Sequence, residues 1–328
     1  MPDTAPIRWG ILGPGNIAHR FAEGAKHLPD AAIVAVASRD RTRAEAFGDR
    51  WDVPRRYDDY QALADDPEVD AVYVATTHPF HRSCALLAID AGKAVLCEKP
   101  FSVNAAEAEE MIGAARRKGV FLMEGMWSRY FPAMQRVREL VSGGAIGAIR
   151  LVQADFGFRS GYDPASRLWA PEQAGGSLLD VGCYTISFAS MLLGEPEQVT
   201  GLATLAPNGV DEQASMVFRH RSGALAALTC AIRASTPQTA TIVGDEGCIR
   251  IGSPWWRPAG FTLEAGGKTE PTEIGFESTG FNYEIAHANR CIRDGLTESP
   301  ILPLDETLSI LRTMDTLRSR WGVRYPME

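Results

Sequence analysis

The chain lacks the features that mark disulfide-linked, zinc-binding, membrane-spanning or nucleic-acid-binding proteins. Its six cysteines are scattered along 328 residues without a C-x-x-C pair, which argues against a zinc site and a disulfide scaffold. The net charge of −8 argues against nucleic acid or an anionic membrane as a main partner. No apolar run approaches the length of a membrane span, and residues 1–6 lack a signal-peptide layout. We therefore expect a cytoplasmic protein with reduced thiols.

Low-complexity segments and internal repeats are also absent from the sequence. The hydrophobic fraction of 45% and charged fraction of 23% are those of an ordinary soluble globular protein, long enough for two domains. The pattern of apolar residues changes after Met126. We predict an α/β Rossmann domain over residues 1–125 and an α+β domain over residues 126–328, whose last helix is free to pack back on the first domain.

Strand-like and helix-like segments alternate through the first domain, which is typical of a doubly wound parallel sheet. The expected strands cover residues 7–12, 32–37, 70–76, 94–99 and 120–124. The expected helices cover residues 16–28, 79–92 and 104–118, with another beginning near residue 41.

The first strand enters a G-x-G-x-x-A turn formed by Gly13, Gly15 and Ala18. In a strand–turn–helix–strand context this pattern predicts a dinucleotide site, because the second glycine lets backbone approach the pyrophosphate and the helix start offers amide donors. We expect Asn16 and Ile17 at that helix start to contact the cofactor. A structural turn without a ligand is the alternative.

The end of the second strand bears on the choice of cofactor. NAD sites usually place an acidic residue there, but this chain has Ser38, followed closely by Arg39 and Arg43. A small hydroxyl with arginines suits a 2′-phosphate, so we predict NADP as the cofactor, with NAD still possible. Asp40 is either a ribose ligand or, as we favour, the cap of the next helix.

Two further strand ends carry polar residues, and ligands bind at this edge of such sheets. A buried strand runs into Glu98, Lys99 and Pro100, and its lysine is either a catalytic cation or a solvated charge. The loop at 76–81 is expected to line the nicotinamide pocket; its two histidines have metal-ligand spacing, but no further ligands gather nearby, so no metal is predicted. The candidate cofactor residues from these two places are Thr76, Thr77, His78, His81, Glu98 and Lys99.

The second domain has closely spaced strand patterns and few helices, which predicts a large, open and mostly antiparallel sheet. Residues 224–232 are apolar on both faces, so this strand should be central and covered. A broad sheet covered on one side only would leave a face for self-association. The expected strands cover residues 151–158, 197–205, 211–219, 224–233, 238–244, 247–251, 260–265 and 270–275, and the expected helices residues 132–141, 283–293 and 304–321.

One further helix, opening at Gly175 and running through Met191, carries polar residues at a helical spacing. Asp180 and Tyr184 are four residues apart and share a face. Polar groups on an otherwise apolar helix need partners. A functional pair and a satisfied structural hydrogen bond are both open at this point.

Together, the G-x-G-x-x-A turn, Glu98-Lys99-Pro100 and the D-x-x-x-Y helix resemble the glucose–fructose oxidoreductase/inositol dehydrogenase (Gfo/Idh/MocA) family over the whole chain. Within it the chain is most similar to the dimeric dihydrodiol dehydrogenase and D-xylose NADP dehydrogenase branch, which shares stretches such as residues 91–100 and 253–258. The resemblance implies an NADP-dependent oxidoreductase acting on a secondary alcohol of a cyclic polyol, trans-dihydrodiol or aldose, and a homodimer or homotetramer formed through the open sheet.

The resemblance also implies residue roles. Lys99 and Tyr184 would be the catalytic pair and Asp180 their electrostatic partner. An aromatic substrate pocket would include Trp127, Phe156, Trp169, Trp256 and Phe281. The alternatives are a keto-sugar reductase of the anhydrofructose or glucose–fructose type, and a non-catalytic dinucleotide-sensing regulator.

Overall fold

The structure is a computed structural model that describes residues 5–328, so the expectation about residues 1–6 lies partly outside the described range. The chain divides into two compact units. The first holds the chain up to Ser102 together with Ala106–Trp127 and Glu277–Thr307, and the second holds Val103–Ala105, Ser128–Phe276 and Leu308–Glu328. The predicted boundary at residue 125 stays a prediction.

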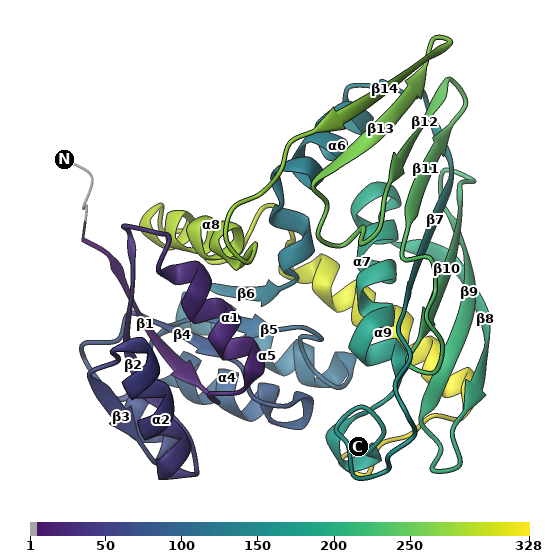
Figure 1. Ribbon diagram of the computed structural model, residues 1–328. Helices are drawn as coiled ribbons and strands as arrows, with labels where there is room; N and C mark the ends of the chain where they lie inside the picture. The colour runs from purple at the N-terminus through teal and green to yellow at the C-terminus, as the bar shows by residue number, and fades with distance from the viewer. Residues whose placement is uncertain (1–4) are drawn as a thin grey trace. The chain divides into compact units, whose positions relative to one another are not determined.

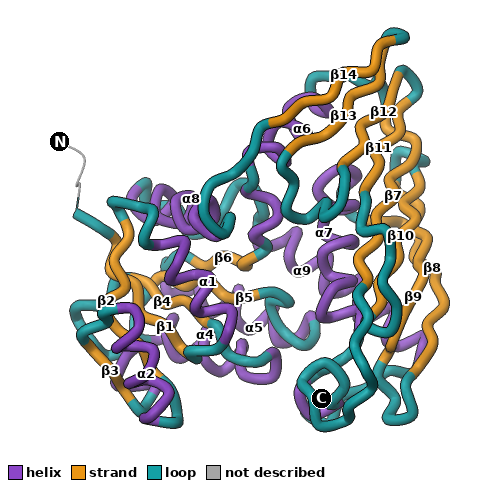
Figure 2. The backbone as a smooth tube through the Cα atoms, in the orientation of Figure 1, coloured by secondary structure: helices purple, strands orange, loops and turns teal. Residues whose placement is uncertain are grey.

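The first unit is built on a parallel sheet in the order β3-β2-β1-β4-β5-β6, as Figures 1 and 2 show. Because the strand order reverses beside β1 and crossovers are right-handed, helices cover both faces of the sheet. Its elements are β1 (Ile7–Leu12), α1 (Asn16–Ala25), β2 (Ala31–Ala37), α2 (Arg41–Trp51), β3 (Arg55–Tyr57), α3 (Tyr60–Ala64), β4 (Ala71–Val74), α4 (His81–Asp90), β5 (Ala94–Glu98), α5 (Ala105–Lys118), β6 (Leu122–Gly125) and α8 (Phe281–Arg293), with α5 beginning at the end of a short excursion into the second unit.

The predicted Rossmann sheet is confirmed, with two additions. The short strand β3 and helix α3 have no counterpart among the expected elements, because three and five residues are too few for a periodic pattern to show. Helix α1 ends at Ala25 rather than residue 28.

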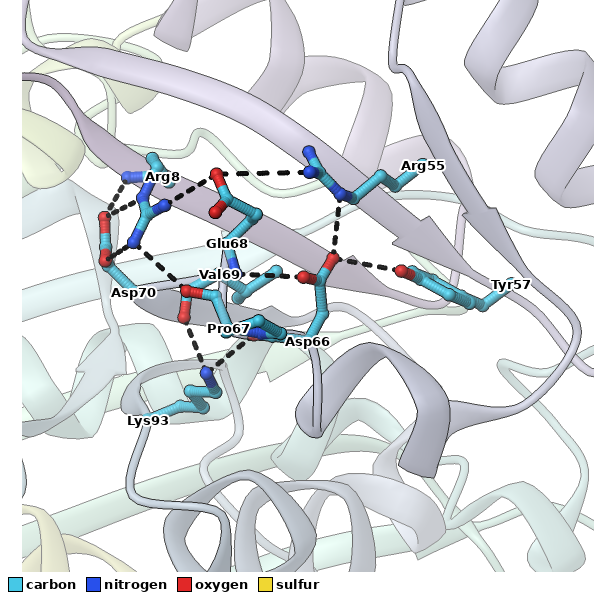
Figure 3. Close-up of polar contacts among 9 residues, drawn as sticks. All are labelled: Arg8, Arg55, Tyr57, Asp66, Pro67, Glu68, Val69, Asp70 and Lys93. Carbon is cyan, nitrogen blue, oxygen red and sulfur yellow. Dashed lines mark hydrogen bonds and ion pairs between the residues drawn. The ribbon is translucent and has the colours of Figure 1, made fainter.

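A polar network ties the amino ends of β1, β4 and β5 together (Figure 3). Arg8 forms ion pairs with Asp70 and Glu68, and Lys93 donates from Nζ to the carbonyls of Asp66 and Val69 at 2.8 Å each. This network fixes one end of the sheet and leaves the opposite, carboxyl-terminal end for ligands.

The second unit contains a mostly antiparallel sheet in the order β14-β13-β12-β11-β7-β10-β9-β8, in which β7 and β10 are parallel. In Figure 1 its helices lie on one face of this sheet. Its elements are α6 (Pro132–Ser142), β7 (Ile149–Gly157), α7 (Cys183–Leu193), β8 (Pro196–Leu205), β9 (Asp211–His220), β10 (Leu225–Ala231), β11 (Ala240–Gly244), β12 (Gly247–Ile251), β13 (Gly260–Ala265), β14 (Lys268–Glu273) and α9 (Leu304–Trp321), the last beginning in the first unit.

The large sheet leaves one face uncovered, and this corrects the expectation for β10. The strand is central, between β7 and β9, but Leu225 is 41% exposed and Ala227 and Thr229 are only half-buried. Helix α7 packs against the other face, where Ala226, Leu228 and Cys230 are buried. The prediction of cover on both faces is therefore wrong, because apolar outward residues can also belong to an open face.

One helical stretch, Pro171–Leu193, is long and apolar enough by length and composition alone to cross a membrane. The expectation that no run reaches that length is wrong by this test. Its most apolar window is 83% buried inside the protein, as in the core helix of a globular domain.

Candidate active site

The glycine turn after β1 has the geometry that close approach of a phosphate requires. Gly13 has φ +89°, and a Cβ there would lie 3.0 Å from the side chain of Thr76. Gly15 precedes α1 without a side-chain cap, and the space where its Cβ would be is open for 4 Å among the described residues. The turn and helix start therefore fit the pyrophosphate of a dinucleotide.

A pocket of about 290 Å³ adjoins this turn. It contains several predicted cofactor residues: Gly13, Gly15, Ser38, Arg39, Arg43, Thr76 and Thr77. The loops after β1, β2 and β4 meet here, as expected at the point where strand order reverses. Two guanidinium groups give the pocket the chemistry to hold an anionic phosphate.

In the segment after β2, Asp40 has the helix-capping role predicted for it. Its carboxylate accepts a hydrogen bond from Thr42 N at 2.9 Å and caps α2, as favoured from the sequence. The Arg39 guanidinium lies 4.5 Å from the Phe80 ring centroid, and Arg43 Nη2 donates to Pro14 O at 3.4 Å. Ser38 is buried, and its Oγ accepts from Asp40 N at 3.2 Å.

Tyr60, the first residue of α3, also lines the pocket. Burial raises the pKa of its phenol, and the positive charges of Arg39 and Arg43 oppose the rise. Tyr60 was not predicted as a site residue, whereas Phe80 was expected only as part of the loop at 76–81. No motif signals Tyr60, because it reaches the pocket through the tertiary placement of a short helix.

His81 is held by backbone rather than aimed into the pocket. Its Nδ1 lies 2.9 Å from Pro100 O and its Nε2 3.1 Å from Thr76 O. A neutral imidazole carries one N–H and can donate to only one of these carbonyls. Burial lowers the His81 pKa, so the neutral ring links the loop after β4 to the turn after Lys99. The other predicted residues outside the pocket lining are Asn16, Ile17, His78, Glu98 and Lys99.

The Glu98 carboxylate faces the core of the first unit. Its Oε1 accepts a short hydrogen bond from Tyr73 Oη, and its Oε2 accepts from Lys99 N at 3.1 Å. Glu284 of α8 is fully buried nearby, and neither of its carboxyl oxygens has a hydrogen-bond partner within residues 5–328. Burial, and then the charge of Glu98, raise the pKa of Glu284 well above its ordinary value.

Asp180 and Tyr184 lie in the second unit on a buried helix that starts irregularly. Residues Leu178–Gly182 form a π-helical turn, in which Cys183 N donates to Leu178 O, and α7 follows. Such turns are frequent at functional sites. A period of 3.6 residues does not reveal them, so the expected regular helix from Gly175 is wrong in detail.

Asp180 is buried and pairs with an arginine that sequence reasoning missed. Arg167 Nη1 lies 3.0 Å from Asp180 Oδ1. Arg167 lies in an irregular loop thirteen residues earlier, where no periodic pattern connects the two. The arginine gives the buried Asp180 carboxylate a charged partner.

Four of the predicted aromatic residues form two stacks, and the fifth, Trp169, packs edge-on against Tyr162. Trp127 stacks on Phe281 in the first unit, with ring centroids 4.8 Å apart. Phe156 stacks on Trp256 in the second unit at 3.4 Å and lies 5.3 Å from the Tyr184 ring. Trp169 is fully buried, and its indole donates to Ser160 Oγ at 3.4 Å.

The chain is similar to known proteins along nearly its whole length. Residues 7–126 match the family model described as "Oxidoreductase family, NAD-binding Rossmann fold", and residues 134–250 match the GFO/IDH/MocA C-terminal domain. Trans-1,2-dihydrobenzene-1,2-diol dehydrogenase of Mus musculus is 40% identical over 98% of this chain and 99% of its own length. The enzyme of the same name from Homo sapiens is 36% identical over the same shares.

Two solved structures have the same fold. An aldose-aldose oxidoreductase from Caulobacter crescentus complexed with glycerol has a TM-score of 0.89 and 27% identity, covering 97% of this chain and 98% of that one. A 3-ketoreductase from Actinomadura kijaniata in complex with NADP and TDP-benzene has a TM-score of 0.85 and 26% identity, covering 96% and 97%.

Proposed function

Because the chain belongs to the GFO/IDH/MocA oxidoreductase family, we propose that it is an NADP-dependent dehydrogenase of a secondary alcohol in a cyclic polyol, trans-dihydrodiol or aldose. One observation carries the proposal. The buried helix that holds Asp180 and Tyr184 packs beside the Phe156–Trp256 stack, in a chain whose first unit contains a dinucleotide pocket.

The chemistry divides between the cofactor and the chain. When bound, the nicotinamide ring supplies or accepts the hydride. Tyr184 takes the hydroxyl proton of the substrate as general base. A free phenol ionises near pH 10, so it needs a neighbouring cation at neutral pH, and Lys99 would supply it. Asp180 would keep the lysine charged and oriented.

We propose the two aromatic stacks as the walls of the substrate site. Flat apolar rings suit the ring face of a dihydrodiol or of a sugar, and they exclude water around the reacting carbon. The relatives support this chemistry, because the curated ones are named for a benzene dihydrodiol and one solved neighbour for aldoses. Trp169 is a weaker candidate for this wall, since its ring is fully enclosed.

A substrate panel tests the proposed function. The purified protein should reduce NADP⁺ with a trans-dihydrodiol, a cyclic polyol or an aldopentose, followed at 340 nm. Faster NADPH oxidation with keto-sugars than NADP⁺ reduction with any alcohol would instead support a keto-sugar reductase, which the 3-ketoreductase neighbour favours. Cofactor binding without turnover of any substrate would contradict both and support a dinucleotide-sensing regulator.

We propose self-association through the uncovered face of the large sheet. Its exposed apolar side chains include Leu202, Val217 and Leu225, and Leu202 is 84% exposed. Leu202→Glu combined with Val217→Lys should convert a dimer or tetramer to a single chain in size-exclusion chromatography with light scattering. Leu296→Glu, an exposed leucine of the first unit, is the matched control and should not change the mass. A wild-type monomer would contradict this proposal.

We also propose a cytoplasmic location. All six cysteines are buried free thiols, a state suited to a reducing compartment.

A further inference from the structure

The start of the Tyr184 helix is held by a carboxylate from another element. Asp211, the first residue of β9, is fully buried. Its Oδ2 accepts hydrogen bonds from Ser177 Oγ at 2.7 Å and from Leu178 N at 2.6 Å. Ser177 makes no local cap of its own, so Asp211 satisfies one of the amide groups that a helix start leaves unpaired.

The neighbouring residues pack closely around the Asp211 carboxylate. Gly176 has φ +118°, and a Cβ there would lie 2.4 Å from Asp211 Oδ1. The Cys230 Sγ of β10 lies 3.4 Å from Ser177 Oγ. Since the hydroxyl proton of Ser177 goes to Asp211, the thiol must be the donor in that contact.

The segment that follows α9 also contacts the start of this helix. Tyr325 Oη donates to Gly175 O at 2.8 Å, and Arg318 of α9 stacks on the Tyr325 ring at 4.8 Å. Arg318, Tyr325 and Cys230 are the charged or titratable groups that act on Asp211 from the elements around it. The positive charge of Arg318 favours the ionised carboxylate.

We propose that Asp211 is a positioning residue for the reaction: its carboxylate caps the π-helical turn and so sets the position of Asp180 and Tyr184. This inference rests on the proposed function, because it assigns Tyr184 the role of base. A hydrogen bond to an ionised acceptor is roughly twice as strong as one to a neutral acceptor. The helix start is therefore held most firmly when Asp211 is ionised.

The contribution of Asp211 to the stability of the fold changes with pH in a defined direction. Burial raises the pKa of Asp211 from 3.8 to about 6, against the hydrogen bonds from Ser177 and Leu178. A carboxyl with a raised folded pKa stabilises the fold most below its ordinary pKa, and this contribution is lost as pH rises through about 6. At pH 8 the fold therefore keeps an ionised Asp211 at a cost in stability.

Asp211→Asn is the first test. We expect kcat at pH 8 to fall by about 3–10-fold with KM within twofold, the size of effect that a weakened charge-assisted hydrogen bond produces. In the wild type log kcat should rise as Asp211 ionises near pH 6, and this step should be absent from Asp211→Asn, which has no carboxyl at position 211. A kcat and a pH profile identical to those of the wild type would overturn the proposal.

Ser177→Ala keeps the proposal testable if the asparagine variant does not fold. Removing a hydrogen bond to the carboxylate should move the acid midpoint to higher pH while the step remains. An unmoved midpoint overturns the proposal. Asp66→Asn is the matched control, because Asp66 is a buried acid that accepts from Glu68 N at 2.9 Å in the first unit (Figure 3). Its pH profile should equal that of the wild type.

A parallel assay of Tyr184→Phe distinguishes a failure of the proposed role of Asp211 from a failure of the proposed role of Tyr184 as base. An inactive phenylalanine variant with an unmoved Ser177→Ala midpoint refutes the role of Asp211 alone. An active phenylalanine variant refutes the assignment of the base, and with it the inference about the position of Tyr184.

Discussion

Tyr184→Phe should lower kcat by about 10²–10⁴-fold, the usual contribution of a general acid or base, and leave KM for the substrate nearly unchanged. The substitution removes one oxygen and keeps the ring packed 5.3 Å from Phe156, so the fold should be retained. The measurement is steady-state turnover with NADP⁺, with thermal denaturation to verify folding.

Tyr162→Phe is the control for the loss of a hydroxyl. Tyr162 is 38% exposed and packs edge-on against Trp169, outside the proposed proton path. Lys99→Met should lower kcat as Tyr184→Phe does, because a phenol without a neighbouring cation ionises only at alkaline pH. Near-normal turnover in either Tyr184→Phe or Lys99→Met would contradict the assignment of the pair.

The sequence predicted the first unit well because its pattern is local. Apart from β3 and α3, the strands and helices between Ile7 and Gly125 repeat the same alternation, and Gly13 and Gly15 occupy the turn where backbone must approach a ligand. Asp40 as the cap of α2 follows from the same local rules. The pocket then gathers Ser38, Arg39 and Arg43 because the strand order reverses there.

Long-range partners were beyond sequence reasoning. Arg167 reaches Asp180 from an irregular loop, and Asp211 caps a helix start that lies 33 residues earlier in the chain. Neither contact produces a periodic pattern in the sequence. Glu284 is similar, because an acidic residue in the first turn of a helix normally indicates an exposed position, whereas here it is fully buried.

The large sheet of the second unit shows a different limit of prediction from sequence. Residues of β10 that point away from α7 are apolar or small, and apolar patterning cannot distinguish a face covered within the chain from one left open. Leu225 belongs to the second kind. The error follows from apolar patterning, which does not report which face of a strand the chain itself covers.

Arg39→Ala should lower kcat/KM for NADP⁺ by about 10–100-fold and change the value for NAD⁺ less than threefold. A hydrogen bond between a guanidinium and a phosphate contributes about 1.5–3 kcal/mol, and only NADP⁺ carries the 2′-phosphate. In the pocket Arg39 lies over Phe80, and Arg43 contacts the glycine loop through its hydrogen bond to Pro14 O. The measurement is kcat/KM for both cofactors at saturating substrate.

Arg41→Ala is the matched control, because Arg41 is an exposed arginine of the same segment that pairs with Glu45 and does not line the pocket. It should leave the NADP-to-NAD ratio unchanged. An equal loss with both cofactors in Arg39→Ala would mean that the arginine only packs against the adenosine moiety, and an unchanged ratio would refute the phosphate clamp. Ser38→Asp tests the same point in the opposite direction: a carboxylate there should repel the 2′-phosphate and favour NAD⁺, because it can accept from the ribose hydroxyl.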